Sequence, residues 1–425
     1  MSYVRELSDF IKNSPTAYHA VEAVKAKLLS LGYTECSEKE TTAFSDGDKH
    51  FVVRNGTSII AFRGRCNGGF MICSSHSDTP TFKVKSEIAG AYAKLAVEKY
   101  GGSILYSWLD RPLSVAGRVV VRTESGVASR LVNINRDLFT IPSVAIHFNR
   151  SVNDGYKFNP AVDMLPLSGT ATAAGKLMEL ISEAANVSEK DVIASDLFLY
   201  NRDEPKIIGV DNELMLSPRL DDLACVYTSM RAFLDAKESA FSMPILAIFD
   251  NEEVGSETKQ GAASTFLDMT LSAIAGGTEK YRAALTDSFM LSADNAHALH
   301  PNHPEFSDSG CAQLLCCGVV VKYNANQRYT TDAVSDAIFR TFAQRAGVKL
   351  QSYANRADML GGSTLGSIAN TRVSVKTVDI GLPQLAMHSS VETVAVSDIA
   401  AMVKVMKEFY SSGISVDGNA IQIKS

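Results

Sequence analysis

The sequence lacks long hydrophobic runs and a large excess of charge of either sign. No apolar run approaches the roughly 20 residues that a membrane-spanning helix needs, so we expect no membrane-embedded segment. A formal net charge of −6 over 425 residues offers no basic surface for nucleic acid or for an anionic membrane. These absences predict a globular protein whose partners are neither nucleic acid nor membrane.

The sequence also lacks a disulfide framework and a targeting signal. The seven cysteines are odd in number and form no Cys-x-x-Cys pair, and most of them have apolar neighbours. The first residues show no basic head followed by an apolar core, so no secretory signal is indicated. A reducing cytoplasm is therefore the expected compartment. We predict small core residues at Cys73, Cys225, Cys311, Cys316 and Cys317.

The composition is 46% hydrophobic and 21% charged, which is typical of a globular protein with a sizeable core. At 425 residues the chain is long enough for two or three domains. Helix and strand patterns alternate towards both ends, whereas short strands separated by glycines fill the middle, with a hairpin pattern over residues 118–134. We therefore predict an α/β domain formed by residues 1–81 and 211–425, interrupted by a β-rich domain at residues 82–210.

The most informative stretch is residues 242–256. Residues 245–249 form a continuous apolar run, which predicts a strand buried on both faces. Three carboxylates follow within four residues, namely Asp250, Glu252 and Glu253. Ligands bind at the carboxyl ends of strands in open α/β sheets, and two adjacent glutamates there are costly unless a cation or a proton compensates them. A solvated acidic loop fits this spacing equally well.

Histidines and aspartates occupy similar positions elsewhere in the chain. His76 and Asp78 follow an apolar segment at residues 69–74, and their i, i+2 spacing lets Asp78 fix the tautomer of His76. Asp221 stands at the start of an amphipathic helix, where simple N-capping is the alternative. The further candidates at the ends of apolar segments are Asp294 and His388.

Histidines recur every three residues from His297 to His303, which invites a metal interpretation. Pro301 and Pro304 break any helix that could align these histidines. We therefore place the chemistry of this segment on Asp294.

The dispersed candidates suit a pair of divalent metal ions. Two histidines with several carboxylates favour zinc, manganese or cobalt over calcium. One of the two adjacent glutamates can bind metal while the other stays free as a general base, which gives the pair a physical reason. Water held between two such ions has its pKa lowered from about 15.7 towards 7, so that a bridging hydroxide is expected at neutral pH.

These residues lie in sequence blocks that resemble the family M18 aminopeptidases, the aspartyl aminopeptidases. The blocks follow one another over nearly the whole chain, at residues 75–80, 219–223, 250–256, 294–301 and 384–389. The resemblance implies a dizinc peptidase domain of the phosphorylase/hydrolase-like α/β type, with the β-rich segment as an inserted dimerisation domain. It also implies a tetrahedral dodecamer built from dimers, and two divalent ions, zinc or, at one site, manganese or cobalt.

The resemblance assigns roles to five metal-ligand candidates. Asp221 would bridge the two ions, and His76 and Asp294 would be terminal ligands to different ions. Glu253 and His388 would complete the ligand set.

The same resemblance makes Glu252 the general base and Asp78 the support of His76. Asp222 departs from the asparagine that often follows the bridging aspartate in the family. Because that position is no ligand in the family, we expect the departure to have no effect.

Two further sites follow from the resemblance alone. Lys322, with nearby Tyr329, matches a lysine expected to meet an acidic first residue of the substrate; a solvated lysine at a strand end is the alternative. His147, in a family block at residues 141–147, would enter the neighbouring subunit's active site, where an imidazole N–H can donate to the developing oxyanion. Its spacing alone instead favours a satisfied structural histidine.

The resemblance implies an exopeptidase that removes the N-terminal residue of peptides and prefers Asp or Glu. A related dimetal aminopeptidase with a neutral or hydrophobic preference is a rival hypothesis. A third hypothesis is an inactive assembly or cargo-binding protein on the same fold. The presence of Glu252 and of all five ligand candidates weighs against this third hypothesis.

Overall fold

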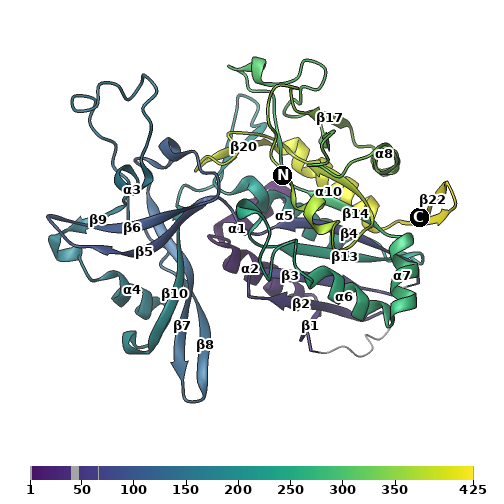
Figure 1. Ribbon diagram of the computed structural model, residues 1–425, viewed down its shortest axis with the longest axis horizontal. Helices are drawn as coiled ribbons and strands as arrows, with labels where there is room; N and C mark the ends of the chain where they lie inside the picture. The colour runs from purple at the N-terminus through teal and green to yellow at the C-terminus, as the bar shows by residue number, and fades with distance from the viewer. Residues whose placement is uncertain (1, 40–46, 66, 425) are drawn as a thin grey trace.

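Two lobes of different architecture make up the protein (Figure 1). The computed structural model describes residues 2–39, 47–65 and 67–424. The larger lobe is built on a nine-stranded mixed sheet of order β1-β2-β3-β13-β4-β14-β18-β16-β17. Its strands are β1 (Thr34–Cys36), β2 (Lys49–Arg54), β3 (Ser58–Arg63), β4 (Gly69–His76), β13 (Ser242–Phe249), β14 (Phe289–Ala293), β16 (Val319–Tyr323), β17 (Leu350–Ala354) and β18 (Lys376–Gly381).

Helices cover both faces of this sheet. One core contains residues of α1 (Ser2–Lys12), α2 (Ala17–Ser30), α5 (Leu220–Asp235), α8 (Ala333–Ala346) and α10 (Val396–Tyr410). The other contains residues of α6 (Phe266–Ala275), α7 (Thr278–Thr286) and α9 (Leu365–Ala369). Along β13, Leu246 and Ile248 enter the first core, whereas Ile245 and Ala247 enter the second. The predicted strand that is buried on both faces is therefore confirmed.

The four strands β13, β4, β14 and β18 lie side by side and run parallel. Their carboxyl ends consequently meet at one edge of the sheet, where the connecting loops can carry functional side chains. β4 ends at His76 and β13 ends directly before Asp250. The candidates that the sequence places at strand ends thus share one edge.

The smaller lobe is a six-stranded antiparallel sheet of order β8-β7-β10-β5-β6-β9. Its strands are β5 (Thr81–Ile88), β6 (Tyr92–Tyr100), β7 (Leu113–Thr123), β8 (Gly126–Asn133), β9 (Leu167–Thr170) and β10 (Val192–Asn201), and α3 (Pro160–Asp163) and α4 (Leu177–Ala184) lie in the same segment. It has a hydrophobic core of its own, which includes Phe82, Trp108 and Val119. β7 and β8 form the predicted hairpin. The domain boundaries at residues 82 and 210 stay a prediction.

A third, five-stranded sheet of order β11-β12-β20-β19-β15 carries further loops towards the edge of the large sheet. Its strands are β11 (Lys206–Ile208), β12 (Leu214–Ser217), β15 (Ala296–His297), β19 (Pro383–Leu385) and β20 (Glu392–Ala395). The remaining elements are the hairpin β21 (Gly413–Asp417) and β22 (Ala420–Lys424) and the 3₁₀ helices η1 (Leu105–Trp108), η2 (Ala171–Ala173), η3 (Glu189–Asp191), η4 (Glu252–Val254) and η5 (Pro304–Phe306). Among the described residues, no helix has both the length and the apolar character to cross a membrane.

The prediction that the cysteines are core residues is correct in strand β4 and helix α5, and wrong for one loop. Cys73 and Cys225 are buried, as predicted. Cys316 is exposed, and Cys311 and Cys317 are half-buried. These three residues lie in the long connection between β15 and β16, and such connections run over the surface whatever their local hydrophobicity.

Candidate metal centre

The six predicted residues, two histidines and four carboxylates, meet in one cavity of about 120 Å³ at the carboxyl edge of the large sheet, and His297 lines the same cavity. The parallel strands supply some of them directly, since His76 is the last residue of β4 and Asp294 follows β14. Others come from η4 after β13, from the start of α5 and from the loop between β19 and β20. The six residues are His76, Asp221, Glu252, Glu253, Asp294 and His388.

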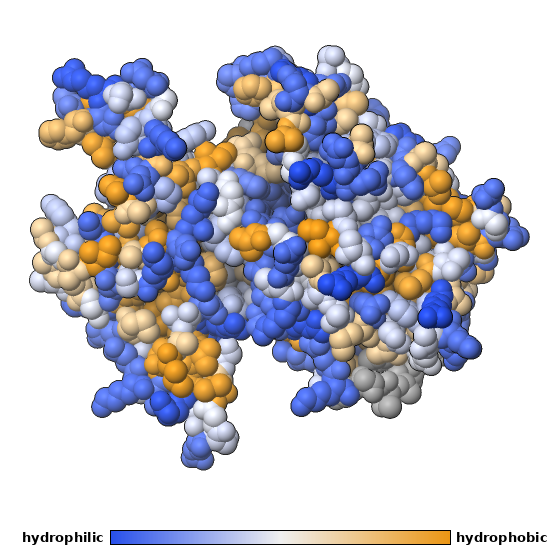
Figure 2. All heavy atoms as spheres, in the orientation of Figure 1, coloured by the Kyte–Doolittle hydropathy of each residue, from blue (hydrophilic) through white to orange (hydrophobic). Residues whose placement is uncertain are grey.

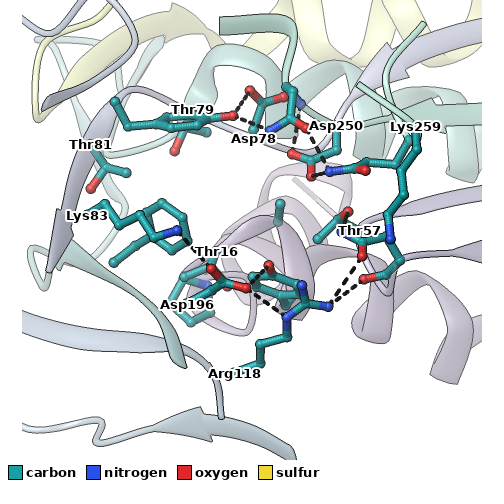
Figure 3. A pocket seen from close by; sticks show the side chains of 18 residues that line it. Thr16, Thr57, Asp78, Thr79, Thr81, Lys83, Arg118, Asp196, Asp250 and Lys259 are labelled. Carbon is teal, nitrogen blue, oxygen red and sulfur yellow. Dashed lines mark hydrogen bonds and ion pairs between the residues drawn. The ribbon is translucent and has the colours of Figure 1, made fainter. Parts of the chain in front are cut away.

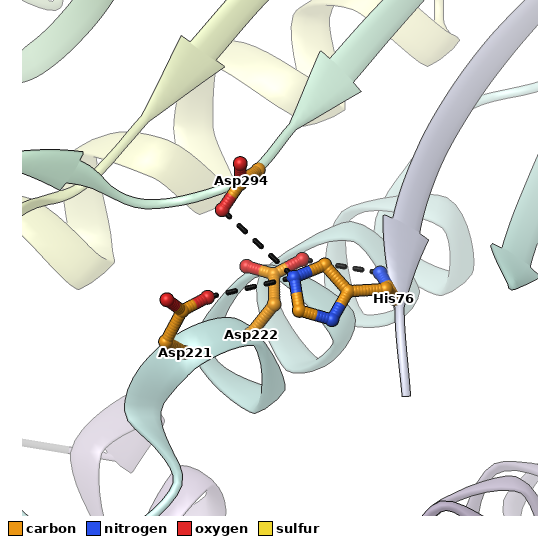
Figure 4. Close-up of side chains that lie close together, drawn as sticks. All are labelled: His76, Asp221, Asp222 and Asp294. Carbon is orange, nitrogen blue, oxygen red and sulfur yellow. Dashed lines mark hydrogen bonds and ion pairs between the residues drawn. The ribbon is translucent and has the colours of Figure 1, made fainter. Parts of the chain in front are cut away.

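Asp221 lies between the two histidines. Its Oδ1 is 3.5 Å from His76 Nε2, and its Oδ2 is 3.5 Å from His388 Nε2. Asp294 Oδ1 lies 3.9 Å from His76 Nε2, and Glu253 Oε2 lies 3.4 Å from His388 Nε2. Figure 4 shows the His76 ring facing both Asp221 and Asp294. Two groups of donor atoms therefore share Asp221.

These donors fit two divalent cations. Among the described residues, possible ligand atoms lie within 4.8 Å of one another in three groups. The first is His76, Asp221, Asp222 and Asp294, the second is Asp221, Glu253 and His388, and the third is His76, Glu252 and Glu253. The first two groups share Asp221. Asp221 Oδ1 and Glu253 Oε1 are buried and accept no hydrogen bond from any described residue. Buried carboxylate oxygens without a partner are costly, and bound cations compensate that cost. Mixed nitrogen and oxygen donors are typical of zinc and its neighbours.

The grouping differs in one respect from the assignment that the resemblance implies. His76 and Asp294 belong to one group that includes Asp221, which favours one shared ion over different ions; which ion each residue would bind stays a prediction. The physical reason is that β4 and β14 are neighbouring parallel strands and end side by side. His388 instead arrives on a loop of the five-stranded sheet and faces Glu253.

Asp78 connects His76 to the segment that carries Glu252 and Glu253. Nδ1–H of His76 donates to the backbone carbonyl of Asp78 (3.1 Å), which leaves Nε2 free to face the cavity. The Asp78 carboxylate accepts the backbone N–H groups of Glu252 (3.1 Å) and Glu253 (3.2 Å). It also accepts the hydroxyl of Tyr100 (2.7 Å). Asp78 therefore positions the glutamate pair as well as His76.

Glu392 performs the corresponding task for the other ligands, and our sequence analysis missed it. Its carboxylate accepts the backbone N–H of Asp221 (3.0 Å) through Oε2 and that of His388 (2.8 Å) through Oε1. The side chain is buried, and burial raises the pKa of Glu392 to about 8. The available signal was a lone carboxylate in the short apolar strand β20, four residues after His388.

The carboxylates around the cavity are crowded and desolvated. Burial raises the pKa of Glu252 to about 8, and burial together with the Asp221 charge raises the pKa of Glu253 well above its usual range. Burial opposes the ionisation of Asp221 too, but the neighbouring His388 and His76 rings hold its pKa below the usual range. Added positive charge favours the ionised form of every carboxylate in such a site.

Asp222 lies beneath the site and is completely buried (Figure 4). Its Oδ2 accepts the backbone N–H of His76 (3.1 Å). Burial raises the pKa of Asp222 well above its usual range. The side-chain oxygen of an asparagine could accept the same backbone N–H, so this contact is open to either residue.

Lys322 and Tyr329 also line the cavity. Lys322 is 2% exposed, so the alternative of a solvated lysine is wrong. Its Nζ donates to Asp294 Oδ2 (3.2 Å) and to the backbone carbonyl of Asn295 (3.0 Å). Nζ lies 5.3 Å from the centre of the Tyr329 ring. Contact with Asp294 was not expected from the sequence, because the two residues meet only in space.

His147 lies apart from the residues that line this cavity. It occupies an exposed loop between Ile141 and α3, and its side chain makes no hydrogen bond or ion pair with any described residue. The interpretation as a satisfied structural histidine is therefore wrong. The structure does not bring His147 to the metal centre of its own chain.

Comparison with known proteins points to one family. The family model described as "Aminopeptidase I zinc metalloprotease (M18)" matches residues 10–410. The "Probable M18 family aminopeptidase 2" of Clostridium acetobutylicum is 41% identical over 97% of this chain and 99% of its own length. Among solved structures, Ape4 in its complex with Nbr1 aligns with a TM-score of 0.93 at 33% identity, over 96% of this chain and 85% of that chain. The mApe1 dodecamer of S. cerevisiae aligns with a TM-score of 0.84 at 27% identity, over 96% of each chain.

We predict that Glu392→Gln weakens metal binding without unfolding the chain. The glutamine amide would set an N–H group against one of two backbone N–H donors, so either the Asp221 or the His388 segment would shift. Changes behind metal ligands typically cost roughly 10–100-fold in affinity. Metal content after dialysis, with circular dichroism for folding, measures the effect. Glu124→Gln, on the exposed β7–β8 turn, is the matched control, and unchanged metal content in Glu392→Gln would contradict this role.

Proposed function

We propose that this chain, which belongs to the M18 family of zinc metalloprotease aminopeptidases, removes N-terminal residues from peptides in the cytoplasm and prefers Asp or Glu there. The observation that carries this proposal is the convergence of two histidines and four carboxylates on one small cavity. One of these carboxylates, that of Glu252, has no hydrogen-bond partner among the described residues and faces the cavity.

The donor groups suggest how the ions are shared. One ion would be held by His76, Asp221 and Asp294, and the other by Asp221, Glu253 and His388. When bound, two divalent ions, zinc or, at one site, manganese or cobalt, supply Lewis acidity and lower the pKa of water. Asp221, which faces both histidines, is the only residue common to the two proposed sets.

Glu252 is the proposed general base. Its backbone N–H is held by Asp78, so the side chain is positioned without using its own carboxylate oxygens. Glu252 would take a proton from the water that attacks the peptide carbonyl and then pass that proton to the leaving amine. Burial disfavours the charged form of Glu252, which suits a group that must hold a proton between these two steps.

Lys322 is the proposed partner of an acidic first residue. An ammonium group has three N–H donors, and Asp294 and the Asn295 carbonyl take two of them. The third would meet the substrate carboxylate inside a buried cavity, where a charge-assisted hydrogen bond is strong. Tyr329 forms the adjoining wall.

His147 is proposed to act in the active site of a neighbouring subunit. The S. cerevisiae relative is a dodecamer, and we propose a dodecamer built from dimers for this chain too. Val144 is 56% exposed and Phe148 is 88% exposed, on either side of His147. Exposed apolar side chains around an exposed histidine are typical of a surface that another chain covers. There the imidazole N–H would donate to the developing oxyanion.

Two alternatives remain on the same fold. One is a dimetal aminopeptidase with a neutral or hydrophobic preference, and the other is an inactive assembly or cargo-binding protein. The buried lysine in the cavity weighs against the first, and the intact donor set weighs against the second.

We predict different outcomes for the two glutamates. Glu252→Gln should keep the fold and both metals but lose roughly 10²–10⁴-fold in turnover, the scale of a positioned acid–base group. Glu253→Gln should instead lose bound metal, because Glu253 faces His388 in a donor group. Peptide hydrolysis, metal content and recovery of chelated protein with zinc, manganese or cobalt measure this. Normal turnover by Glu252→Gln, or full activity of metal-free native protein, would overturn the mechanism.

We predict faster cleavage of N-terminal Asp and Glu than of Leu, and a smaller ratio in Lys322→Ala. Because Lys322 also holds Asp294, all rates of this variant should fall. The ratio of kcat/KM values separates the two effects, since a weakened metal site lowers both rates alike. Equal rates on acidic and neutral substrates in the native protein would remove the proposed preference.

We predict that two inactive variants restore each other. After dissociation and reassembly, mixed His147→Ala and Glu252→Gln chains should regain part of the native activity, because some sites would receive both intact groups. The removal of an oxyanion donor typically costs on the order of 10²–10³ in rate, so the recovery is measurable. Full activity of His147→Ala alone, or no recovery in demonstrably mixed oligomers, would show that His147 does not act across subunits.

A further inference from the structure

A second and larger cavity is lined by Asp78, among others, and Figure 3 shows the side chains that line it. Its volume is about 390 Å³, and none of the five proposed metal ligands lines it. Its walls are formed by the start of α2, by the loops before β3, after β4 and after β13, and by the strands β5, β6, β7 and β10 of the smaller lobe. The cavity is therefore a junction between the two lobes.

Most of the charge in this cavity is neutralised within the protein. Asp196 Oδ1 lies 2.8 Å from Lys83 Nζ, and Asp196 Oδ2 lies 3.0 Å from Arg118 Nε. The hydroxyl of Tyr18 donates to the same carboxylate (3.2 Å). These three elements, β10, β5 and β7, are thus joined to α2 by one ionic cluster.

Two charged groups of opposite sign are left over. Lys259 forms no ion pair or side-chain hydrogen bond with any described residue, although it lines the cavity. Asp250 is 5% exposed, and its carboxylate accepts the backbone N–H of Asn251 (2.8 Å) and Nε2 of Gln260 (3.3 Å) but pairs with no lysine or arginine among the described residues. Figure 3 shows Asp250 and Lys259 on the wall opposite Lys83. The cavity therefore offers one exposed cation that pairs with no described residue, that of Lys259, and a carboxylate at Asp250 that, like the neighbouring Asp78, has no lysine or arginine partner among the described residues.

Aromatic rings complete the walls. The Arg118 guanidinium lies 4.7 Å from the centre of the Tyr18 ring, and Lys83 Nζ lies 5.7 Å from that of Phe198. Tyr100 packs edge-on against Phe198, with ring centres 5.7 Å apart. Apolar walls with a few polar groups are typical of small-molecule sites. A small ligand with one positive and one negative group could meet Asp250 and Lys259 and still pack a short side chain against the rings.

The cavity touches the groups that hold the active site. Tyr100 donates its hydroxyl to Asp78 and accepts Nδ2–H of Asn251 (2.8 Å). Asp78 in turn holds the backbone of Glu252 and Glu253. A ligand that contacts Tyr100 or Asp78 could therefore shift the position of Glu252, the proposed general base.

We propose that this cavity binds a free α-amino acid, with its ammonium group at Asp250 and its carboxylate at Lys259, and that occupancy changes the turnover of the enzyme. That such a ligand is also the reaction product rests on the proposed function, whereas its binding does not. The site would let the supply of free amino acid adjust the rate at which peptides are degraded.

Isothermal titration calorimetry with L-glutamate tests the binding. The metal-loaded native chain, with its active site filled by an amino-acid hydroxamate, should show one saturable event per chain. Lys259→Met should weaken it about tenfold or more, the scale of a lost charge-assisted hydrogen bond. Lys280→Met, on the exposed side of α7, is the matched control and should bind as the native chain does. Glutarate, which lacks the ammonium group, and 4-aminobutyrate, which lacks the α-carboxylate, should each bind more weakly than L-glutamate.

Absence of saturation, unchanged binding in Lys259→Met, or equal binding of glutarate would overturn the site. The coupling is tested separately, at peptide concentrations that saturate the active site. There L-glutamate should change kcat by about twofold or more in the native protein and not in Lys259→Met. Binding without any change in kcat would overturn the coupling. If the native chain hydrolysed no peptide, calorimetry would still decide the binding.

Discussion

Buried negative charge is the constraint on which the functional part of this protein depends. Asp221, Glu253 and Asp294 come within a few ångströms of one another through two histidines, in surroundings largely closed to water. Several carboxylates cannot stay ionised in such a place without positive charge. The parallel strands that bring these carboxylates together therefore also create the need for cations. Without added positive charge, the assembled carboxylates cannot all be ionised.

Two buried carboxylates that face away from the cations keep this arrangement in place. Asp78 fixes His76 and the glutamate pair, and Glu392 fixes Asp221 and His388. Each one binds backbone groups, so it orients a segment without competing for the metal-facing atoms. Hydrogen bonds from backbone N–H to a carboxylate are strong when buried. Asp78 and Glu392 thus orient the site from two sides, and neither residue needs to touch substrate.

The sequence predicts this site well where a residue's position along the chain determines its place in space. His76, Glu253 and Asp294 follow buried strands, and the parallel order of those strands brings them together. The sequence does not predict a contact between residues that are far apart in the chain and carry no local pattern. Glu392 has no local feature apart from its charge in an apolar strand, and the burial of Lys322 depends on Asp294, which arrives from another strand. The cysteines of the β15–β16 connection show the reverse error, since local hydrophobicity does not place a loop in a core.

The two passages of the chain between the lobes are unequal. On the way out, only residues 77–80 separate His76, the last residue of β4, from the start of β5. All of that passage lies beside the metal centre, and Asp78 is part of it. On the way back, residues 202–205 lead from β10 to β11, and the turn between β11 and β12 carries Val210, which is almost fully exposed. The smaller lobe is consequently no exchangeable module. A chimera that took this lobe from a distant relative could absorb a change of length at the exposed turn after β11, but the outgoing passage would have to be inherited together with the Glu252–Glu253 segment that it holds.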